Sequence, residues 1–320
     1  MPTAVGPSSS TLTAPASSSA PANPGRLPVF FFSHGTTAMM GEQSEPAAYW
    51  EEVGRRAIEC GVERLVFQGA HWHPDTPDFL VATNPKPPKQ PVAWVEPSKY
   101  VNFEVDIDVP FSEHIIETLN AQGISAKAAP DFEIIHDTLL ILRWMFPKGR
   151  SLPMSIISTN GFFDPHKNLA VGTALSHLRD EKCLLIGSGG AVHNLYRLNY
   201  TQVIFHKDNF AQEKEPEQWA IDFGQAVTDA IKRYSGPKLR RALVSLMDSP
   251  QYRDAHGTDD HYLPILFSAG AATGSERDLR QPNHVGAECW ELRNMRNTQY
   301  QFGRWPQTPY FTDLPKRAAS

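Results

Sequence analysis

The stretch that decides the fold is Val29-Phe30-Phe31-Phe32-Ser33-His34-Gly35, in which four apolar residues lead directly into a polar turn. A short and wholly apolar run of this kind is consistent with a strand buried in a parallel sheet. The histidine comes at the carboxyl end of that strand, which is the edge where α/β folds form their binding sites. We therefore predict a strand over Val29–Phe32 that presents His34 at such an edge.

Outward from this stretch, apolar runs of strand length alternate with amphipathic helical stretches. Further strands are predicted at Arg64–Phe67, Val92–Val95, Ile124–Ala128, Met154–Ser158 and Cys183–Ile186. Helices are predicted at Pro46–Cys60, Phe111–Gln122, His136–Phe146, Pro165–Leu178, Glu217–Tyr234, Lys238–Met247 and Tyr262–Ala272. Proline-rich Thr76–Pro97 is otherwise expected to be loop, and the polar tail after Arg277 to be irregular. The alternation predicts an α/β fold with a mostly parallel central sheet flanked by helices.

Length and composition narrow the class of protein. A chain of 320 residues could form one large α/β domain or two small ones, and no segment in its middle resembles a linker. The net charge of −5 includes no basic run, which argues against a nucleic-acid partner. The three cysteines lie far apart and indicate neither a disulfide framework nor a C-x-x-C site, so we expect a reducing, cytoplasmic compartment.

The first residues of the chain differ in composition from the rest. Residues 1–26 are mostly Ser, Thr, Ala and Pro and carry no charge before Arg26. They lack the apolar segment of a signal peptide and the arginines of a transit peptide, so we predict a disordered low-complexity tail before a folded region over 27–320. No apolar run is long enough to span a bilayer, and we expect no membrane association.

Four histidines lie next to predicted strand ends or helix starts. His34, His71, His193 and His261 each lie just past a strand-like run or at the start of a helix-like one. The ends of parallel strands converge at one sheet edge, so residues distant in sequence can meet there. One histidine beside an apolar run is more often structural than functional, but the repetition makes this set a candidate for a zinc or iron site.

The glycine-rich turn Gly187-Ser188-Gly189-Gly190 precedes His193. It lacks the lysine of a phosphate-binding loop, and Ile186 stands where a nucleophile elbow needs glycine. We interpret it as a tight strand-to-helix turn that places His193 near a helix N-terminus, whose dipole would favour a neutral imidazole. A neutral histidine beside a metal can act as a general base near pH 7.

Taken together, the motifs resemble the class III extradiol ring-cleavage dioxygenases, and within these the DOPA-dioxygenase-like branch. The resemblance runs in order from about Val29 to about Ala272. It rests on Ser33-His34-Gly35, Gly69-Ala70-His71-Trp72, the run from Gly187 to Leu195, and His256-Gly257-Thr258-Asp259-Asp260-His261-Tyr262-Leu263-Pro264.

This resemblance implies a single-domain α/β fold with one non-haem metal ion, Fe(II) for turnover, with Zn(II) also described in the same site. By motif position His34, His71 and His261 would be the metal ligands. His193 would be the acid/base residue, with a role as fourth ligand as the alternative. Because non-haem oxygenases generally use two histidines and one carboxylate, Asp260 is an alternative third ligand.

The resemblance also implies that His136 and His256 line the substrate pocket. Two departures fall beside them. The family's H-P-T-P-E-H-F-L-P appears here as the segment from His256 to Pro264, and its Asp-His-Gly is replaced by Ile135-His136-Asp137. We therefore expect the substrate pocket to differ from that of the DOPA enzymes more than the metal site does.

The reaction implied is cleavage of a catechol ring next to the diol, with O2, to a muconic semialdehyde product. The substrate would be DOPA-like or another 3,4-dihydroxyphenyl compound. Two other functions fit the same residues. One is a zinc-dependent hydrolase, in which three histidines and a water supply the nucleophile. The other is a binding protein without enzymatic activity on the same fold. The sequence leaves the choice of catechol and the oligomeric state open.

Overall fold

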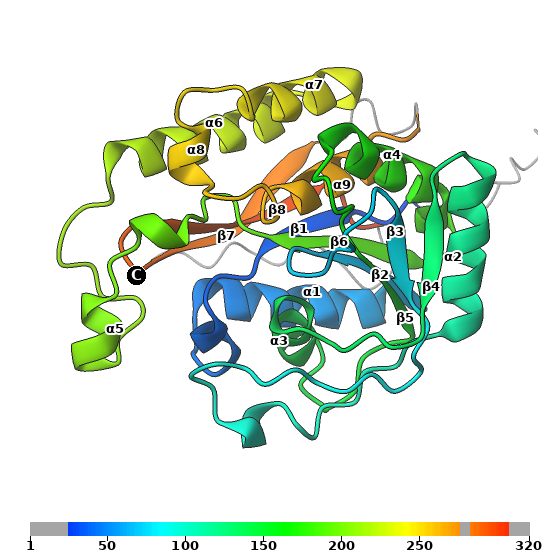
Figure 1. Cartoon of the computed structure of the whole chain (residues 1–320), viewed down its shortest axis with the longest axis horizontal. Helices are drawn as coiled ribbons and strands as arrows, with labels where there is room; N and C mark the ends of the chain where they lie inside the picture. Colours follow the sequence, from blue (N-terminus) through cyan, green and yellow to red (C-terminus); the bar gives the residue numbers. More distant parts are fainter. Residues whose placement is uncertain (1–24, 276–281, 307–320) are drawn as a thin grey trace, which may run out of the picture.

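An eight-stranded sheet runs through the part of the chain that the computed structural model describes, residues 25–275 and 282–306 (Figure 1). Residues 1–24 of the predicted tail, which covers 1–26, therefore lie outside the described residues. In chain order the strands are β1 (Val29–Ser33), β2 (Arg64–Gly69), β3 (Phe79–Ala82), β4 (Ala126–Ala129), β5 (Met154–Ile157), β6 (Cys183–Gly189), β7 (Asn283–Glu291) and β8 (Met295–Phe302).

The order across the sheet is β4-β3-β5-β2-β6-β1-β8-β7. The pairs β3–β4, β5–β2, β2–β6 and β6–β1 are parallel, whereas β3–β5, β1–β8 and β8–β7 are antiparallel. The prediction of an α/β fold with a mostly parallel central sheet is confirmed. The antiparallel β7–β8 hairpin extends the sheet beyond β1 at one edge.

Helices cover both faces of this sheet. The α-helices are α1 (Glu45–Glu59), α2 (Val109–Ala121), α3 (His136–Met145), α4 (Pro165–Leu175), α5 (Thr201–His206), α6 (Gln218–Arg233), α7 (Gly236–Leu246), α8 (Tyr252–Ala255) and α9 (Leu263–Ala272). The described residues also form four 3-10 turns: η1 (Thr37–Met40), η2 (Pro97–Lys99), η3 (Ser176–Asp180) and η4 (Leu195–Arg197). No helix among the described residues is long and apolar enough to cross a membrane.

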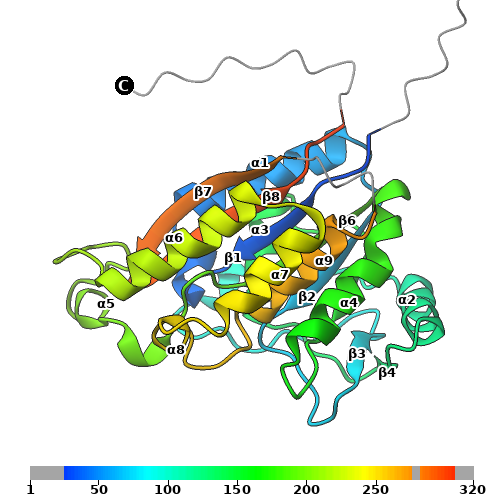
Figure 2. The ribbon, with the colours of Figure 1, turned by 90° about the horizontal axis from the view of Figure 1, so that it is seen from above.

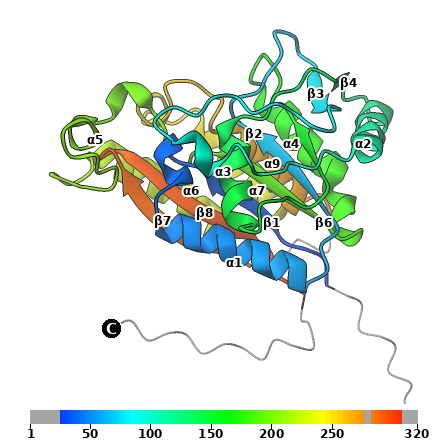
Figure 3. The same cartoon turned by 90° about the horizontal axis from the view of Figure 1, so that it is seen from below.

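The alternation of side chains along β1 divides the core in two. Val29 and Phe31 face a cluster shared with α4, α6, α7 and α9, which lie together over one face of the sheet (Figure 2). Phe30 and Phe32 face the opposite cluster, which includes α1 and α3 (Figure 3). Successive residues of a strand point to opposite faces, so a strand in the middle of a three-layer fold must be apolar on both. This requirement explains the unbroken apolar run in β1.

Two predictions about irregular segments were wrong. Val92–Val95 forms a turn, and the strand in that proline-rich region is β3, which is flanked by prolines on both sides. The polar segment after Arg277 was predicted to be irregular, but residues 283–302 form the β7–β8 hairpin. Polar residues 296–299 of β8 are all buried, because their side chains have hydrogen-bond partners within the protein. Arg296 and Thr298 donate to Glu288 of β7, Asn297 donates to Glu291, and Gln299 accepts from Trp50.

Helices α1 and α3 pack so closely that Gly54 has no room for a side chain. A Cβ atom built there would lie 2.0 Å from the carbonyl oxygen of Met145. We expect Gly54→Ala to lower the free energy of unfolding by about 1–3 kcal/mol, because the helices must separate. Urea denaturation measures this change. Gly41→Ala is the matched control, since its nearest neighbour is 4.0 Å away, and equal losses in both variants would contradict the argument.

Candidate metal centre

Strands β1, β2 and β6 end side by side, and His34, His71 and His193 follow shortly after their last residues. Strand β6 lies between β1 and β2, with Ser33 opposite Gly189 and Gly69 opposite Ser188. His34 continues from β1, and its backbone N–H donates to the carbonyl of Gly189 at 3.0 Å. The expectation that residues distant in sequence meet at the carboxyl edge of a parallel sheet is thereby confirmed for this part of the chain.

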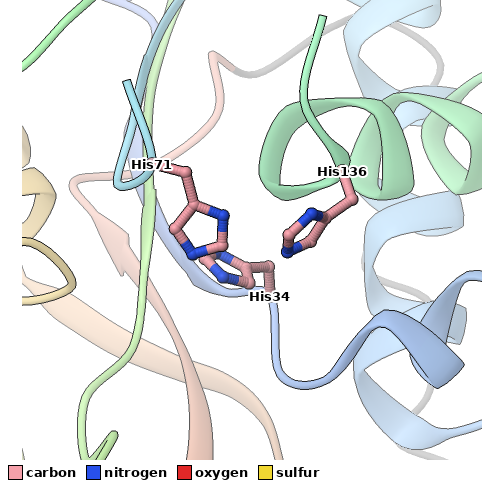
Figure 4. Close-up of side chains that lie close together, drawn as sticks. All are labelled: His34, His71 and His136. Atoms are coloured by element: carbon pink, nitrogen blue, oxygen red, sulfur yellow. The ribbon is translucent and has the colours of Figure 1, made fainter. Parts of the chain in front are cut away.

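Imidazole rings converge at this edge. The candidate ligand atoms of His34, His71 and His136 all lie within 4.8 Å of one another (Figure 4). His136 reaches the group from the first residue of α3, and its ring centroid is 4.5 Å from that of His71. The structure therefore places His136, predicted to line a substrate pocket, among the residues that could hold a metal.

His261 joins the group from the other side of the sheet edge. Its Nε2 lies 2.9 Å from Nε2 of His71. On the far side of its ring, Nδ1 lies 3.0 Å from Oδ2 of Asp260. This is an ion-pair distance only, and Nδ1 of His261 is buried without a hydrogen-bond partner.

The glycine-rich segment was predicted to be a turn, but Gly187, Ser188 and Gly189 are the last residues of β6. It packs directly against His261. The backbone N–H of Gly190 donates to the His261 carbonyl at 2.9 Å. A Cβ atom on Gly189 would lie 2.2 Å from the same carbonyl oxygen. This close backbone approach sets the position of the segment that carries His261.

His34 shows that a metal fits the site. Its Nδ1 lies 3.1 Å from Ser188 Oγ, and the Ser188 hydroxyl donates to the Asp137 carbonyl at 2.7 Å. The single hydroxyl proton is thus used, so Ser188 accepts a hydrogen bond from Nδ1–H of His34. Nε2 of His34 then carries a lone pair, and it is buried without a hydrogen-bond partner. A buried acceptor of this kind needs a ligand or a cation.

His193 lies against His261 rather than facing it edge-on. The two rings stack with centroids 3.5 Å apart and planes 7° from parallel. The segment after His193 is the three-residue turn η4, so the predicted helix N-terminus at this position is absent from the structure. Whatever keeps His193 neutral is therefore its surroundings and not a helix dipole.

His256 is fully buried behind His193. Its ring is surrounded by Phe223, Tyr252 and Tyr262, and its Nε2 lies 3.2 Å from the Ala191 carbonyl. Because a carbonyl only accepts, Nε2 carries the proton and Nδ1 the lone pair. That Nδ1 is buried without a hydrogen-bond partner. His256 thus combines an enclosed ring with one free acceptor atom.

The surroundings of the cluster favour neutral imidazoles. Burial, followed by repulsion from neighbouring imidazoles, holds the pKa of His34 and His193 well below the usual value. Burial is also the main cause that lowers the pKa of His71 and His256 to about 3 each. For Asp260, burial acts to raise the pKa, but contact with His261 outweighs it and the pKa lies below its usual range. Neutral imidazoles are the form that binds metals.

These pKa values predict how the metal-free protein responds to acid. The pKa of each of these four histidines in the folded protein lies below the unfolded value of about 6.5. The unfolded chain therefore takes up protons that the folded chain does not. The contribution of these imidazoles to the free energy of unfolding should be fully present above pH 6.5. It should be lost as the pH falls toward 3. His71 and His256 together should contribute up to about 3 kcal/mol per pH unit between pH 6 and 4.

Urea denaturation at a series of pH values, with a chelator present, measures this dependence. His256→Phe keeps an aromatic ring in the buried space and should reduce the slope by about 1.4 kcal/mol per pH unit, the contribution of one proton. A stability that stays constant from pH 8 to pH 5 would contradict the assignment of neutral, buried imidazoles.

We assign the other six histidines to surface or structural roles. Five of them have exposed side chains: His73, His114, His166, His206 and His284. His177 is half-buried, and its Nδ1 lies 3.0 Å from the Ala174 carbonyl. His73 contacts the ring of Phe163, with 5.0 Å between the ring centroids.

Three residues that hold the centre in place were not singled out from the sequence. The Asp137 carboxylate accepts the backbone N–H of His71, and the Ser188 hydroxyl lies 3.1 Å from Nδ1 of His34. Glu291 is fully buried at the end of β7, and its carboxylate accepts from the backbone N–H and the hydroxyl of Thr36, two residues after His34. A carboxylate in a segment that was predicted to be irregular offered no signal of this role.

The comparisons with known proteins agree with the predicted family resemblance and with the fold. The family model described as "Catalytic LigB subunit of aromatic ring-opening dioxygenase" matches residues 28–303. A protein of Escherichia coli named 4,5-DOPA dioxygenase extradiol is 24% identical over 279 residues, which covers 87% of this chain and 95% of that protein. A protein of the same name from Portulaca grandiflora is 26% identical over 286 residues, covering 85% and 94%.

A solved structure supports the fold. The crystal structure of an uncharacterized protein from Escherichia coli superimposes with a TM-score of 0.68 at 23% sequence identity. The superposition covers 87% of this chain and 100% of the other.

Proposed function

Because this chain belongs to the LigB family of aromatic ring-opening dioxygenase catalytic subunits, we propose that it is a metal-dependent extradiol dioxygenase that cleaves a catechol with O2. The product would be a muconic semialdehyde. Residues 27–320 would form the catalytic domain, and the three separated cysteines favour work in the cytoplasm. The observation that carries the proposal is the buried, unpartnered Nε2 of His34 beside the other imidazoles at one sheet edge.

We assign His34, His71 and His261 as the metal ligands. The contact of Nδ1 with Ser188 leaves Nε2 of His34 free to bind, and Nε2 of His71 lies 2.9 Å from Nε2 of His261. His136 points to the same place and is a further candidate for this role. When bound, Fe(II) would supply a Lewis acid and an electron relay for O2, and Zn(II) could occupy the same nitrogens.

His193 would move the proton in this reaction. Burial and neighbouring imidazoles keep it neutral, so it can accept a proton from a catechol hydroxyl beside the ligands. Its stacking on the ring of His261 fixes the plane of the imidazole and hence the direction from which it approaches the substrate. The backbone N–H of His193, which donates to Ala255 at 2.9 Å, holds the residue against the segment that leads to His256.

His136 and His256 would contact the substrate. His136 is only half-buried at the start of α3, so it can reach both the metal-facing group and a bound catechol. His256 offers the free Nδ1 acceptor, which suits a hydroxyl donor. Neutral hydrogen-bonding groups of this kind would recognise the two hydroxyls of the catechol, and other residues would contact the rest of the ring.

Oxygen uptake by the Fe(II)-loaded protein, measured with a panel of catechols, tests the proposal. We expect uptake with at least one 3,4-dihydroxyphenyl compound, and a yellow ring-opened product. The Zn(II)-loaded protein should consume no oxygen. Zinc-dependent hydrolysis under strict anaerobiosis, without uptake by the iron form, would instead support a hydrolase that uses the same three histidines.

A further inference from the structure

We propose that Asp137 is a positioning residue that sets both His34 and His71, using its carboxylate for one and its main-chain carbonyl for the other. The inference rests on the proposed metal centre. It concerns the position directly after His136, where this chain departs from the pattern that it resembles.

The carboxylate of Asp137 holds the backbone at His71. Its Oδ2 accepts the His71 N–H at 3.0 Å, and the side chain is only 2% exposed. Asp137 lies in the first turn of α3, where a negative charge is favoured by the helix dipole. A hydrogen bond to a buried charged acceptor is stronger than one between neutral groups. The turn that carries the His71 ring is therefore tied to the same helix that presents His136.

The main-chain carbonyl of Asp137 acts on His34 through one intermediate. It accepts the Ser188 hydroxyl proton at 2.7 Å, which leaves Ser188 Oγ as an acceptor for Nδ1–H of His34 at 3.1 Å. The relay selects the tautomer that has its lone pair on Nε2, the atom that is buried without a partner. Without it, His34 could adopt either tautomer, and only one of them can bind a metal through Nε2.

The end of β2 is shaped to admit the Asp137 carboxylate. A Cβ atom on Gly69 would lie 2.4 Å from Asp137 Oδ2. The carboxylate thus occupies the space that a side chain at position 69 would fill, two residues before His71. Gly69 and Asp137 fit together, and a side chain at 69 would displace the carboxylate from the His71 N–H.

Metal affinity tests this role directly, because it can be measured without turnover. The chelator-treated protein is titrated with Zn(II) against a competing chelator, for the wild type, Asp137→Ala, Asp137→Asn and Ser188→Ala. We expect Asp137→Ala and Ser188→Ala to weaken binding by about 10–100-fold, the usual effect of losing a residue that orients a ligand. Asp137→Asn should stay within a few-fold of wild type, since its amide oxygen can accept the His71 N–H.

Asp108→Ala is the matched control. Asp108 also accepts one backbone N–H in the first turn of a helix, from Phe111 at 3.1 Å, but lies at the opposite edge of the sheet beside Arg64. Its loss should lower the melting temperature and leave metal affinity unchanged. The absorption spectrum of the Co(II)-loaded protein gives a second readout, which should change in Asp137→Ala and Ser188→Ala and persist in Asp137→Asn and Asp108→Ala.

The outcomes separate this inference from the proposed function. A wild-type protein that binds no metal would refute the proposed centre itself. A wild type that binds one ion, together with an unchanged Asp137→Ala, would refute only the role of Asp137. Equal weakening in Asp137→Asn and Asp137→Ala would show that charge, not positioning, matters. If Asp137→Ala does not fold, Gly69→Ala replaces it and should weaken binding by displacing the carboxylate.

Discussion

Replacing His34 or His71 with alanine is expected to abolish metal binding, from one ion per chain to almost none, and with it all ring cleavage. Each residue contributes a neutral imidazole whose candidate ligand atom faces the other. Removing one of three protein ligands leaves two nitrogens, which hold a divalent ion far less tightly than three. Elemental analysis after dialysis against a weak chelator gives the stoichiometry.

The same measurement decides between His261 and His136 as the third ligand. We expect His261→Ala to lose the metal, because Nε2 of His261 lies 2.9 Å from Nε2 of His71. His136→Ala should keep most of the metal and lose turnover, as a residue that contacts substrate. The opposite pattern would show that the third ligand is His136, as its place among the converging imidazoles also allows.

His114→Ala is the control for these variants, because His114 is an exposed histidine on α2. It should bind one ion and turn over like the wild type. Circular dichroism should show a native spectrum for every variant, since the imidazoles lie at a sheet edge and not within the two apolar cores. Full metal occupancy in His71→Ala would refute the arrangement as a whole.

Replacing His193 with glutamine is expected to retain the metal and to reduce turnover by about 10²–10⁴-fold, the usual contribution of a general acid–base group. Glutamine keeps a polar side chain but cannot accept and return a proton near neutral pH. The rate of oxygen uptake at saturating catechol, with metal content measured on the same samples, tests this expectation.

His193→Phe serves as the structural control, because a phenyl ring preserves the stacking on His261 while removing both nitrogens. Equal losses of turnover in the two variants, both at full metal occupancy, would assign the effect to proton transfer. If His193 were instead a fourth ligand, both variants would bind metal more weakly, and added Fe(II) would restore part of the rate. Near wild-type uptake by a metal-replete variant would exclude either role.

The layered fold was predictable because it depends on local patterns. The apolar run of β1 and the helical periodicity of segments such as α1 and α6 reflect which faces are buried. The convergence of His34, His71 and His193 followed from the same reasoning, since parallel strands must end at a common edge. The motif resemblance added the assignment of roles, which spacing alone did not supply.

The β7–β8 hairpin was not predictable in this way. Strand β8 contains Asn297, Thr298 and Gln299, all buried. Gln299 accepts the indole N–H of Trp50, and the Thr298 carbonyl accepts the Ser33 hydroxyl. Polarity in a sequence predicts exposure only when the hydrogen-bond partners are water. Here Asn297 and Thr298 donate to glutamates of β7, and the partner of Gln299 is 249 positions away.

The histidines could be identified from the sequence, but the residues that orient them could not. Sequence alone was enough to identify which imidazoles could meet, because strand ends and helix starts are local features. It could not reveal that Asp137 reaches both His71 and Ser188, or that Glu291 holds the turn after His34. Those contacts join segments far apart in the chain, so only the packed structure determines which proton each imidazole carries and where its free nitrogen points.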